Sequence, residues 1–301
     1  MQKFNRIVVF GVGLIGGSFA LALKHGGCVR EVIGVGRRRE TLERAQALGI
    51  IDGIGSAASV ASADLVLLAA PVAQTETLLR DIAIHLQPGT VVTDAGSTKS
   101  DVVLAARAAL GDKIGQFIPG HPIAGREQNG PDAALPDLYQ GKKVVLTALP
   151  ENAKDCVTKV AIAWEQCGAI IHRLTAEEHD AVFAAVSHLP HLLAYALVDD
   201  IAARDNAERL FQYAASGFRD FTRIAGSSPE MWRDISLANR PALLAELDTY
   251  TAQLAHLRAR LAASDGAGLE KIYGRAQAAR QAWIAAIEAA EQARADEQGG
   301  D

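Results

Sequence analysis

This chain has few cysteines, no excess of basic charge and no long apolar runs. Each of these shortages excludes a class of protein. The three cysteines (Cys28, Cys156 and Cys167) are odd in number and lack metal-ligand spacing, so we expect neither a disulfide framework nor a metal site. Lysine and arginine total 30 against 35 acidic residues, for a net charge of -5. The chain therefore lacks the excess of basic residues that is typical of proteins that bind nucleic acid or an anionic membrane surface.

No uninterrupted apolar run reaches the ~18–20 residues of a membrane-spanning helix. The first residues, MQKFNRIVVFGVG, enter a strand pattern at once and show no separate apolar region or cleavage site of a signal peptide. Sparse cysteine is typical of a reducing compartment. These features predict a cytoplasmic protein without a membrane partner.

Short apolar runs rich in β-branched residues alternate with helical stretches in the first part of the chain. The expected strands are residues 6–10, 31–35, 64–69 and 90–93. Near-continuous apolar strands separated by helices indicate a parallel sheet that is covered on both faces. Two later runs, 143–147 and 169–172, flank a helical stretch, and we expect them to extend the same sheet.

The pattern changes at Thr175, after which only helical periodicity is found. Thr175 and Glu178 have the spacing of a capping box at the start of a helix. Within residues 243–261, leucine and tyrosine recur at spacings of three and four, as in a coiled-coil seam, and 269–294 predicts another helix. Residues 173–301 are therefore expected to be an all-α helical domain. Its apolar stripes form either the core of an intrachain bundle or the interface of a homodimer.

A glycine-rich turn, GVGLIG at 11–16, follows the first strand and opens a helix. In this context GxGxxG is the fingerprint of a dinucleotide site. Gly11 allows the tight turn, Gly13 lets the backbone approach the pyrophosphate, and Gly16 lets helix and strand pack closely. The helix N-terminus faces the phosphate charge. We therefore expect residues 1–172 to be a Rossmann-type α/β domain. The cofactor-binding residues expected in this turn are Gly11, Gly13, Leu14, Ile15 and Gly16.

Three arginines follow the second strand, where NAD-binding sites usually place a carboxylate for the ribose 2′-hydroxyl. The chain has Gly36 there and continues with Arg37, Arg38 and Arg39. A guanidinium group can bind a 2′-phosphate through two hydrogen bonds. The sequence therefore favours NADP, with NAD still possible, and Arg37 and Arg38 as its ligands. The alternative is a solvated basic loop at the start of the next helix.

Further polar segments follow strands of the predicted sheet, at the edge where open α/β sheets bind ligands. They contain Pro71 after one strand, Ser97 after the next, and then His121. We expect His121 on a loop made rigid by Pro122, with Ser97 within reach. A histidine in a loop is by itself more often an ordinary surface residue.

Five motifs make this chain resemble the prephenate/arogenate dehydrogenase family over nearly its whole length. They are GVGLIGGS at 11–18, DAGSTK at 94–99, GHPIAGRE at 120–127, SHLPH at 187–191 and GFRDFTRIAGSSPEMWRDI at 217–235. The combination of GHPIAG with a downstream FRDxTRI is far more specific than the glycine fingerprint. The resemblance implies a Rossmann domain followed by a helical dimerisation domain. With few residues before the first strand and helical periodicity to the end, we expect a single-function member.

The resemblance also implies an activity, the oxidative decarboxylation of the small molecules prephenate or arogenate on the route to tyrosine. It assigns the catalytic histidine to His121 and the serine that orients the reacting hydroxyl to Ser97. The substrate-carboxylate arginine is Arg223. The other positions that it implies in the substrate pocket are His188, His191, Asp220 and Trp232.

Elementary chemistry agrees, because a neutral imidazole near working pH is a suitable acceptor for the hydroxyl proton as the ring carbon loses hydride. A dianionic substrate needs a cation, which Arg223 offers as a planar fork. Other interpretations remain for the helical residues. Arg223 would otherwise be an exposed charge or pair with Asp220, and Trp232 would belong to the core. The histidines would reflect helix polarity around a kink at Pro190.

Two competing functions remain open at this stage. A β-hydroxyacid dehydrogenase also joins a Rossmann domain to a helical one, but it carries a catalytic lysine in the helical domain. Here Lys271 is the only lysine after residue 172. A non-catalytic NADP-binding sensor would keep the fingerprint, but would give Ser97, His121 and Arg223 no reason to occur together.

Overall fold

The computed structural model describes residues 3–126 and 128–298 of the chain. By its internal contacts the chain divides into two compact units, Met1–Leu244 and Ala245–Asp301. The described strands and helices α1 to α10 belong to the first unit, and the second consists of two long helical segments.

A parallel sheet of six strands forms the centre of the first unit, in the order β3-β2-β1-β4-β5-β6. This is the strand order of a doubly wound dinucleotide-binding fold, with its switch point between β1 and β4. The predicted parallel sheet is thereby confirmed, although β3 and β6 are too short to be recognised as strands from the sequence. The strand bounds are β1 (Phe4–Phe10), β2 (Val29–Val35), β3 (Gly53–Ile54), β4 (Leu65–Leu68), β5 (Val91–Asp94) and β6 (Phe117–Ile118).

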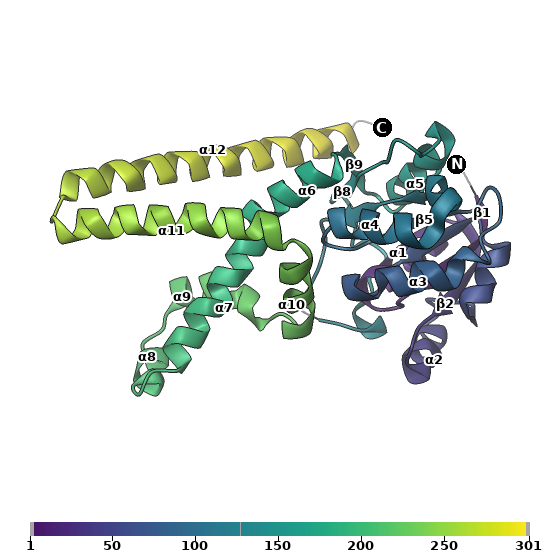
Figure 1. Ribbon diagram of the computed structural model, residues 1–301, viewed down its shortest axis with the longest axis horizontal. Coiled ribbons are helices and arrows are strands. Elements are labelled where there is room, and N and C mark those ends of the chain that lie inside the picture. The colour runs from purple at the N-terminus through teal and green to yellow at the C-terminus, as the bar shows by residue number, and fades with distance from the viewer. Residues whose placement is uncertain (1–2, 127, 299–301) are drawn as a thin grey trace. The chain divides into compact units, whose positions relative to one another are not determined.

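Both faces of this sheet are apolar and covered by helices. Ile7 and Val9 of β1 belong to one buried cluster, whereas the alternate residues Val8 and Phe10 belong to another, so the clusters lie on opposite faces. Helices α1 and α5 contribute to the first cluster, and α3 and α4 to the second, where they lie side by side (Figure 1). The helix bounds are α1 (Leu14–His25), α2 (Arg39–Ala47), α3 (Thr75–Ala83), α4 (Ser100–Leu110) and α5 (Lys154–Gln166).

The two later strands do not extend this sheet, contrary to the prediction. Strands β8 (Lys143–Leu146) and β9 (Ile170–Arg173) are parallel, and β8 pairs antiparallel with β7 (Gly120–Pro122) in a separate sheet of three strands. After β6 comes Pro119, which has no N–H to continue the first ladder, and the chain then turns to β8. His121 accordingly lies in a strand, not in the loop predicted for it.

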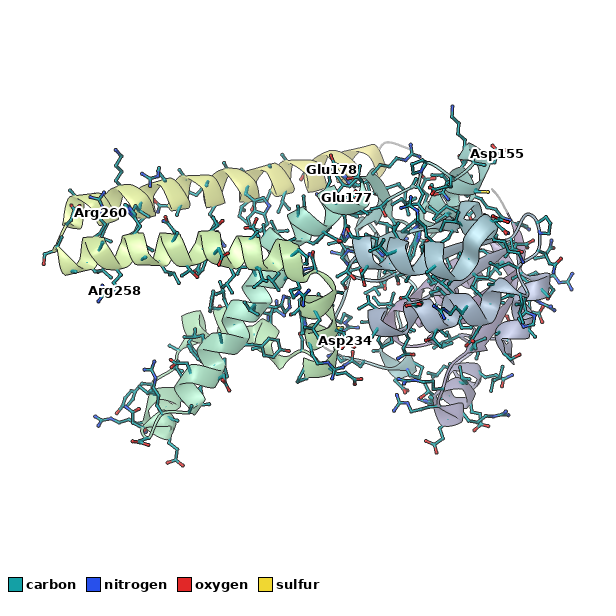
Figure 2. All side chains as sticks on the ribbon, in the orientation of Figure 1. Asp155, Glu177, Glu178, Asp234, Arg258 and Arg260 are labelled. Atoms are coloured by element: carbon teal, nitrogen blue, oxygen red, sulfur yellow. The ribbon has the colours of Figure 1, made fainter. Side chains whose placement is uncertain are left out.

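Helices α6 to α10 complete the first unit. Helix α6 begins with the predicted capping box, in which the N–H of Glu178 donates to Thr175 Oγ1 (3.1 Å) and the N–H of Thr175 donates to Glu178 Oε2 (2.8 Å). Figure 2 labels Glu178 beside Glu177 in this first turn. A π-helical turn, Ala184–His188, precedes α7, and Pro190 stands in the first turn of α7, so the regular α-helical pattern is interrupted just before the proline. The bounds are α6 (Ala176–Phe183), α7 (Leu189–Ala202), α8 (Ala207–Gln212), α9 (Ser216–Thr222) and α10 (Pro229–Ala238).

The helical run Ala176–Ala202 is long and apolar enough to cross a membrane by length and composition, with a mean hydropathy of 1.6. A search for uninterrupted apolar runs misses it because acidic residues and histidines interrupt it. His179, Asp180 and His188 in this run are buried and form hydrogen bonds to other parts of the first unit. Its length and composition alone therefore do not indicate a membrane segment.

The second unit consists of the greater part of α11 (Arg240–Ala262) and of α12 (Gly266–Gln298). Residues 263–265 connect the two helices as a short αα-hairpin (Figure 1). Both predicted helices are confirmed. Several large apolar side chains of this unit are 47–62% exposed, so an intrachain core does not account for the predicted seam. They are Leu254, Leu261, Tyr273 and Trp283.

Candidate active site

A pocket of about 780 Å³ lies at the carboxyl ends of β1, β2 and β4. Its wall includes the turn at 11–13, the segment 36–38 and the segment 69–71, which contains Pro71. The pocket therefore opens at the β1–β4 switch point, where sheets of this topology bind their ligands.

The fingerprint glycines are required by the shape of this turn. Gly11 has a φ of +90°, and a Cβ there would lie 2.5 Å from the carbonyl oxygen of Ala69. A Cβ on Gly16 would lie 2.2 Å from the carbonyl oxygen of Gly11, whereas Gly13 faces open space. A side chain at Gly11 or Gly16 would thus displace the backbone, and the bare Gly13 leaves room for a phosphate group. These residues fit a dinucleotide.

Leu14 and Ile15 open α1, but their side chains do not line the pocket. Leu14 is buried in the core, and the carbonyl oxygen of Ile15 accepts a hydrogen bond from Tyr139 Oη (2.6 Å). The cofactor contact predicted for these two residues is therefore limited to their backbone N–H groups at the helix N-terminus.

The arginines after β2 differ in what they contact. Arg37 and Arg38 are exposed and line the pocket, together with the hydroxyl-bearing Thr41. Arg39 instead pairs with Glu43 along α2, with 2.8 Å between Nε and Oε1. The structure therefore singles out Arg37 and Arg38 as the cations at this end of the pocket.

A buried ion pair marks the end of β5. Lys99 is fully buried, and its Nζ donates a hydrogen bond to Asp94 Oδ2. Asp94 also accepts the N–H of Gly96 (2.8 Å) and the N–H of Gly120 (3.0 Å). One carboxylate thus joins the loop after β5 to β7, one residue before His121.

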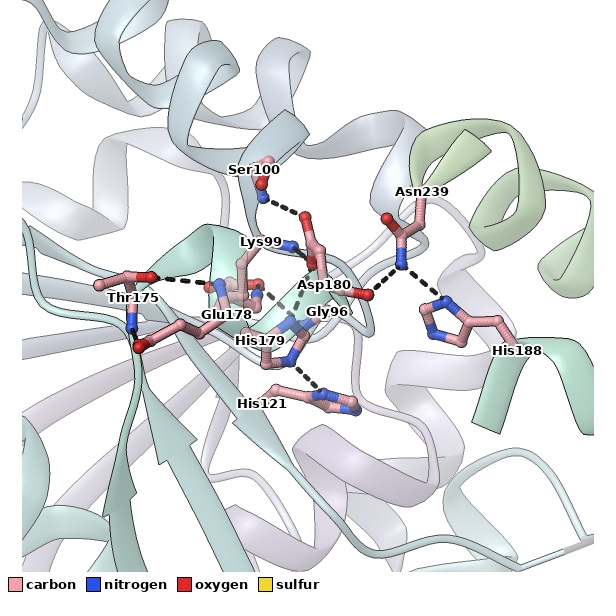
Figure 3. A network of polar contacts seen from close by, with 11 residues as sticks. Gly96, Lys99, Ser100, His121, Thr175, Glu178, His179, Asp180, His188 and Asn239 are labelled. Carbon is pink, nitrogen blue, oxygen red and sulfur yellow. Dashed lines mark hydrogen bonds and ion pairs between the residues drawn. The ribbon is translucent and has the colours of Figure 1, made fainter. Parts of the chain in front are cut away.

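His121 is the outer member of a chain of polar side chains (Figure 3). Its Nδ1 lies 2.8 Å from Nε2 of His179, whose Nδ1 lies 2.8 Å from Oδ1 of Asp180. Oδ1 and Oδ2 of Asp180 accept the backbone N–H groups of Lys99 and Ser100, both at 2.8 Å. The carboxylate is therefore fixed at the start of α4.

This environment keeps both imidazoles neutral and the carboxyl group ionised at neutral pH. Burial, followed by the positive charges of nearby groups, holds the pKa of His121 well below its ordinary value. Burial also lowers the pKa of His179, against the opposing effect of Asp180. Burial alone would raise the pKa of Asp180, but hydrogen bonds from His179 and the start of α4 outweigh it and lower that pKa.

A second branch of the network connects Asp180 to His188. Asn239 is buried, and its Nδ2 lies 2.8 Å from the carbonyl oxygen of Asp180 and 3.0 Å from His188 Nδ1. Burial lowers the pKa of His188 to about 4, and the charge of Asp180, followed by the backbone of Ser97, partly opposes that shift. The backbone of Ser97 thus lies beside His188. Among the described residues no hydrogen bond joins Ser97 to His121.

Of the other predicted substrate residues, His191 lies on α7, Trp232 on α10 and Arg223 in the 3₁₀-helical turn Arg223–Gly226 after α9. The rings of His191 and Trp232 are stacked with centroids 3.5 Å apart, and His191 Nδ1 contacts the carbonyl oxygen of Ser187 at 2.9 Å. Burial lowers the pKa of His191, and the positive charge of Arg223 lowers it further. The structure thus brings His191 and Trp232 together, with Arg223 near enough for its charge to act on His191.

Asp220 is the exception among the predicted substrate residues. Its side chain is 72% exposed and lies 3.7 Å from Nε of Arg219, its neighbour in sequence. Within residues 3–126 and 128–298 no hydrogen bond or ion pair joins Asp220 to His191 or His121. Glu127, the last residue of the GHPIAGRE motif, lies outside the described residues.

Comparison with known proteins assigns this chain to a family. The model of the nucleotide-binding domain of prephenate dehydrogenase matches residues 19–173, and that of its dimerization domain matches 175–274. This chain belongs to the prephenate dehydrogenase family. It is therefore an NAD(P)-dependent oxidoreductase with a helical dimerisation domain. The glycine fingerprint lies before the matched residues, so the shape of its turn is a separate indication of cofactor binding.

Several relatives of this dehydrogenase are similar over most of their length. The cyclohexadienyl dehydrogenase of Zymomonas mobilis is 37% identical over 94% of this chain and 97% of its own. The structure of A. aeolicus prephenate dehydrogenase with hydroxyphenyl propionate and NAD+ has a TM-score of 0.87 and 36% identity, covering 93% of this chain and 98% of that one. Synechocystis arogenate dehydrogenase has a TM-score of 0.79 and 29% identity, covering 92% and 99%.

Sequence reasoning missed the members of the network that connect the motifs of this dehydrogenase. They are His179, Asp180 and Asn239. One signal was available, because His179 and Asp180 directly follow the capping box on the face of α6 that also carries the buried Phe183. Polar residues on a buried helix face require partners. The identity of those partners follows only from the fold.

Proposed function

We propose that this enzyme oxidises and decarboxylates prephenate, arogenate or both, with hydride transfer to NADP and 4-hydroxyphenylpyruvate or tyrosine as the product. One observation carries the proposal: His121 is a partly buried imidazole with a lowered pKa, so it is neutral at neutral pH, and its Nδ1 already contacts His179. His121 lies in β7, the strand that follows the last strand of the central sheet. The switch point of that central sheet forms the dinucleotide pocket. The printed names of the relatives supply the substrate class.

His121 is the general base of this proposal. Loss of hydride from the ring carbon becomes easier as its hydroxyl proton leaves, and a neutral imidazole can accept that proton. Ser97 would hold the hydroxyl in line, from its place beside His188. Loss of the ring carboxylate as carbon dioxide then makes the ring aromatic, so the reaction is effectively irreversible.

The nicotinamide dinucleotide supplies the hydride acceptor when it is bound. Gly11, Gly13 and the N–H groups at the start of α1 would hold its pyrophosphate. Arg37 and Arg38 support NADP over NAD, because they line the pocket where a carboxylate would otherwise bond the ribose. One relative was crystallised with NAD+, so the preference needs a direct test.

Substrate carboxylates would be bound from the helical side. Arg223 offers the cation, and its charge reaches His191, which stacks on Trp232. His188 would complete the pocket wall near Ser97. Asp220 would act indirectly, by orienting the segment that carries Arg223, since its own carboxylate is exposed.

The two domains divide these tasks. Residues 1–172 would bind the cofactor, and residues 173–301 would supply substrate contacts and a homodimer interface. The match of 175–274 to a dimerization domain and the exposed leucines of α11 support the homodimer. Three free cysteines support a cytoplasmic location.

The test is a spectrophotometric assay of nicotinamide reduction with prephenate or arogenate, each against NAD and NADP. Turnover with either acid and a higher kcat/KM for NADP is the expected result. Folded protein without turnover in all four combinations would overturn the proposed reaction. Turnover that favours NAD would overturn only the cofactor assignment.

A further inference from the structure

We propose that His179 and Asp180 are positioning residues that fix His121 in a single tautomer, with the proton on Nδ1 and the lone pair on Nε2 free to accept a proton from substrate. The inference rests on the proposed function of His121 as the base. Its central claim is the position of one proton, which can be measured without turnover.

The direction of the hydrogen bonds follows from Asp180. Its carboxylate accepts two backbone N–H groups at the start of α4 and has a lowered pKa, so it is ionised and can only accept. The 2.8 Å contact to His179 Nδ1 therefore requires a proton on that nitrogen. A neutral imidazole carries only one N–H, so Nε2 of His179 is an acceptor.

The same reasoning then determines the state of His121. Its Nδ1 lies 2.8 Å from the bare Nε2 of His179 and must donate to it. The opposite tautomer would direct two lone pairs at each other across a part-buried contact of 2.8 Å. Because His121 is neutral, its single proton is on Nδ1 and its Nε2 is left as the acceptor.

Packing prevents the chain from rearranging. The ring of Phe183 lies against both imidazoles, with centroid separations of 4.9 Å to His121 and 4.5 Å to His179. Asn239 holds the backbone carbonyl of Asp180 at 2.8 Å. The orientation of the base is thus set by α6, although the base itself belongs to β7.

Asp180 also supplies the countercharge for His121 once it is protonated. The charged or titratable groups around His121 are His179, Asp180, Lys99, Asp94 and His188. Lys99 and Asp94 form a closed ion pair, and His179 and His188 are neutral. Asp180 is the carboxylate at the inner end of this chain, and we infer that it favours an imidazolium at His121 through the intervening His179.

The first test reads the tautomer by nitrogen NMR of the full chain labelled with ¹⁵N-histidine, with His121→Asn to assign the signal. We expect a protonated Nδ1 and an unprotonated Nε2 at His121. His179→Leu removes the acceptor and should give both tautomers. His179→Gln retains an acceptor oxygen and should restore the Nδ1–H form. A proton on Nε2 in the unsubstituted chain, or an unchanged signal in His179→Leu, would overturn the proposal.

The second test is kinetic and uses Asp180→Asn. Removing the carboxylate should lower kcat by about 100-fold or more, by analogy with the aspartate of a Ser-His-Asp triad, with little change in KM. The acid limb of the kcat–pH profile should move to lower pH, because the imidazolium loses its countercharge. A fall in kcat with an unmoved limb and an unchanged tautomer would reveal a merely structural role and overturn the proposal.

Matched controls come from exposed residues nearby. Glu177→Gln removes a charge from the first turn of α6 (Figure 2), and His172→Leu removes an exposed imidazole from β9. Both should leave kcat, the pH profile and the His121 signal unchanged. If the unsubstituted enzyme reduces neither cofactor with prephenate or arogenate, the proposed function fails. The NMR result decides the tautomer assignment separately.

Discussion

The dinucleotide pocket and the buried network around His121 stand close to the same sheet, yet they are built in different ways. The pocket is formed by short segments that each follow a strand, and glycine at Gly11 and Gly16 gives it its shape. The network joins residues that are far apart in sequence, such as His121 and His179, which are 58 positions apart. A local motif therefore suffices for the pocket, whereas the network exists only in the folded chain.

The two regions also differ in how they use charge. The pocket presents exposed guanidinium groups to a ligand, while the network holds neutral imidazoles, the Asp180 carboxylate and the Lys99–Asp94 ion pair largely away from water. Acidification should therefore disturb the network first. Substitutions in one region should leave the property of the other region intact, and this separation can be tested.

The largest difference between the two regions is expected from His121→Asn, which should lower turnover and leave cofactor binding intact. Loss of a general base typically lowers turnover by about 10²–10⁴-fold, and we expect a fall of that size in kcat. The dissociation constant of NADP, measured by calorimetry, should stay within about twofold because the pocket does not include His121. Retained turnover would remove His121 as the base. A large loss of cofactor affinity would show that the two regions are not separable.

The stability of the fold should depend on pH through the network. His188 has a pKa of about 4 in the folded chain, against an ordinary value of 6.5. Between these values the unfolded chain binds a proton that the folded chain does not, so stability is lost as pH falls from 6.5 to 4 and is constant above that window. The full loss from this group is roughly 3 kcal/mol. Burial of His121 and His179 acts in the same direction.

Urea unfolding at pH 7, 6 and 5 measures this dependence. His188→Gln should flatten the curve, whereas His172→Gln, which replaces an exposed imidazole, should leave it unchanged. The same slope in His188→Gln and the unsubstituted chain would show that other groups dominate acid unfolding.

The predictable part of the molecule is the part governed by short-range rules. The apolar runs around β1 and β4 gave the parallel sheet, because a strand buried on both faces needs no alternation. The capping box at Thr175 is confirmed because it involves residues only three apart. Arg37 and Arg38 lie at the pocket because a strand end fixes their position.

The remainder depends on packing that a single sequence does not display. The second sheet could not be predicted, because nothing around Lys143 indicates that its strand pairs with β7. His121 was expected on a loop, since glycine and proline flank it, but pairing with β8 overrides that preference. The partnership of His121 with His179 and Asp180 requires β7 and α6 to be adjacent, which no local pattern encodes.

The preference for NADP over NAD is expected to depend on the pocket and not on the network around His121. Replacing Arg37 and Arg38 together by glutamine should raise the KM for NADP by about 10–100-fold, since hydrogen bonds to charged groups contribute roughly 1.5–3 kcal/mol. The KM for NAD should change little, and so should the pH dependence of stability. Arg39→Gln is the matched control, because Arg39 pairs with Glu43 and does not line the pocket. An equal effect on both cofactors would remove the 2′-phosphate role.

The smallest effect is expected at Arg223, which acts on His191 and is the proposed ligand of a substrate carboxylate. Arg223→Ala should raise the KM for prephenate or arogenate by about tenfold and leave kcat nearly unchanged, since it removes a carboxylate contact present before and during reaction. Arg219→Ala, in the same segment but beside Asp220, should change neither constant. A fall in kcat would mean that Arg223 acts on the reacting centre. Because its charge also lowers the pKa of His191, that pKa should rise in Arg223→Ala, and histidine NMR can follow the rise even where kinetics show no effect.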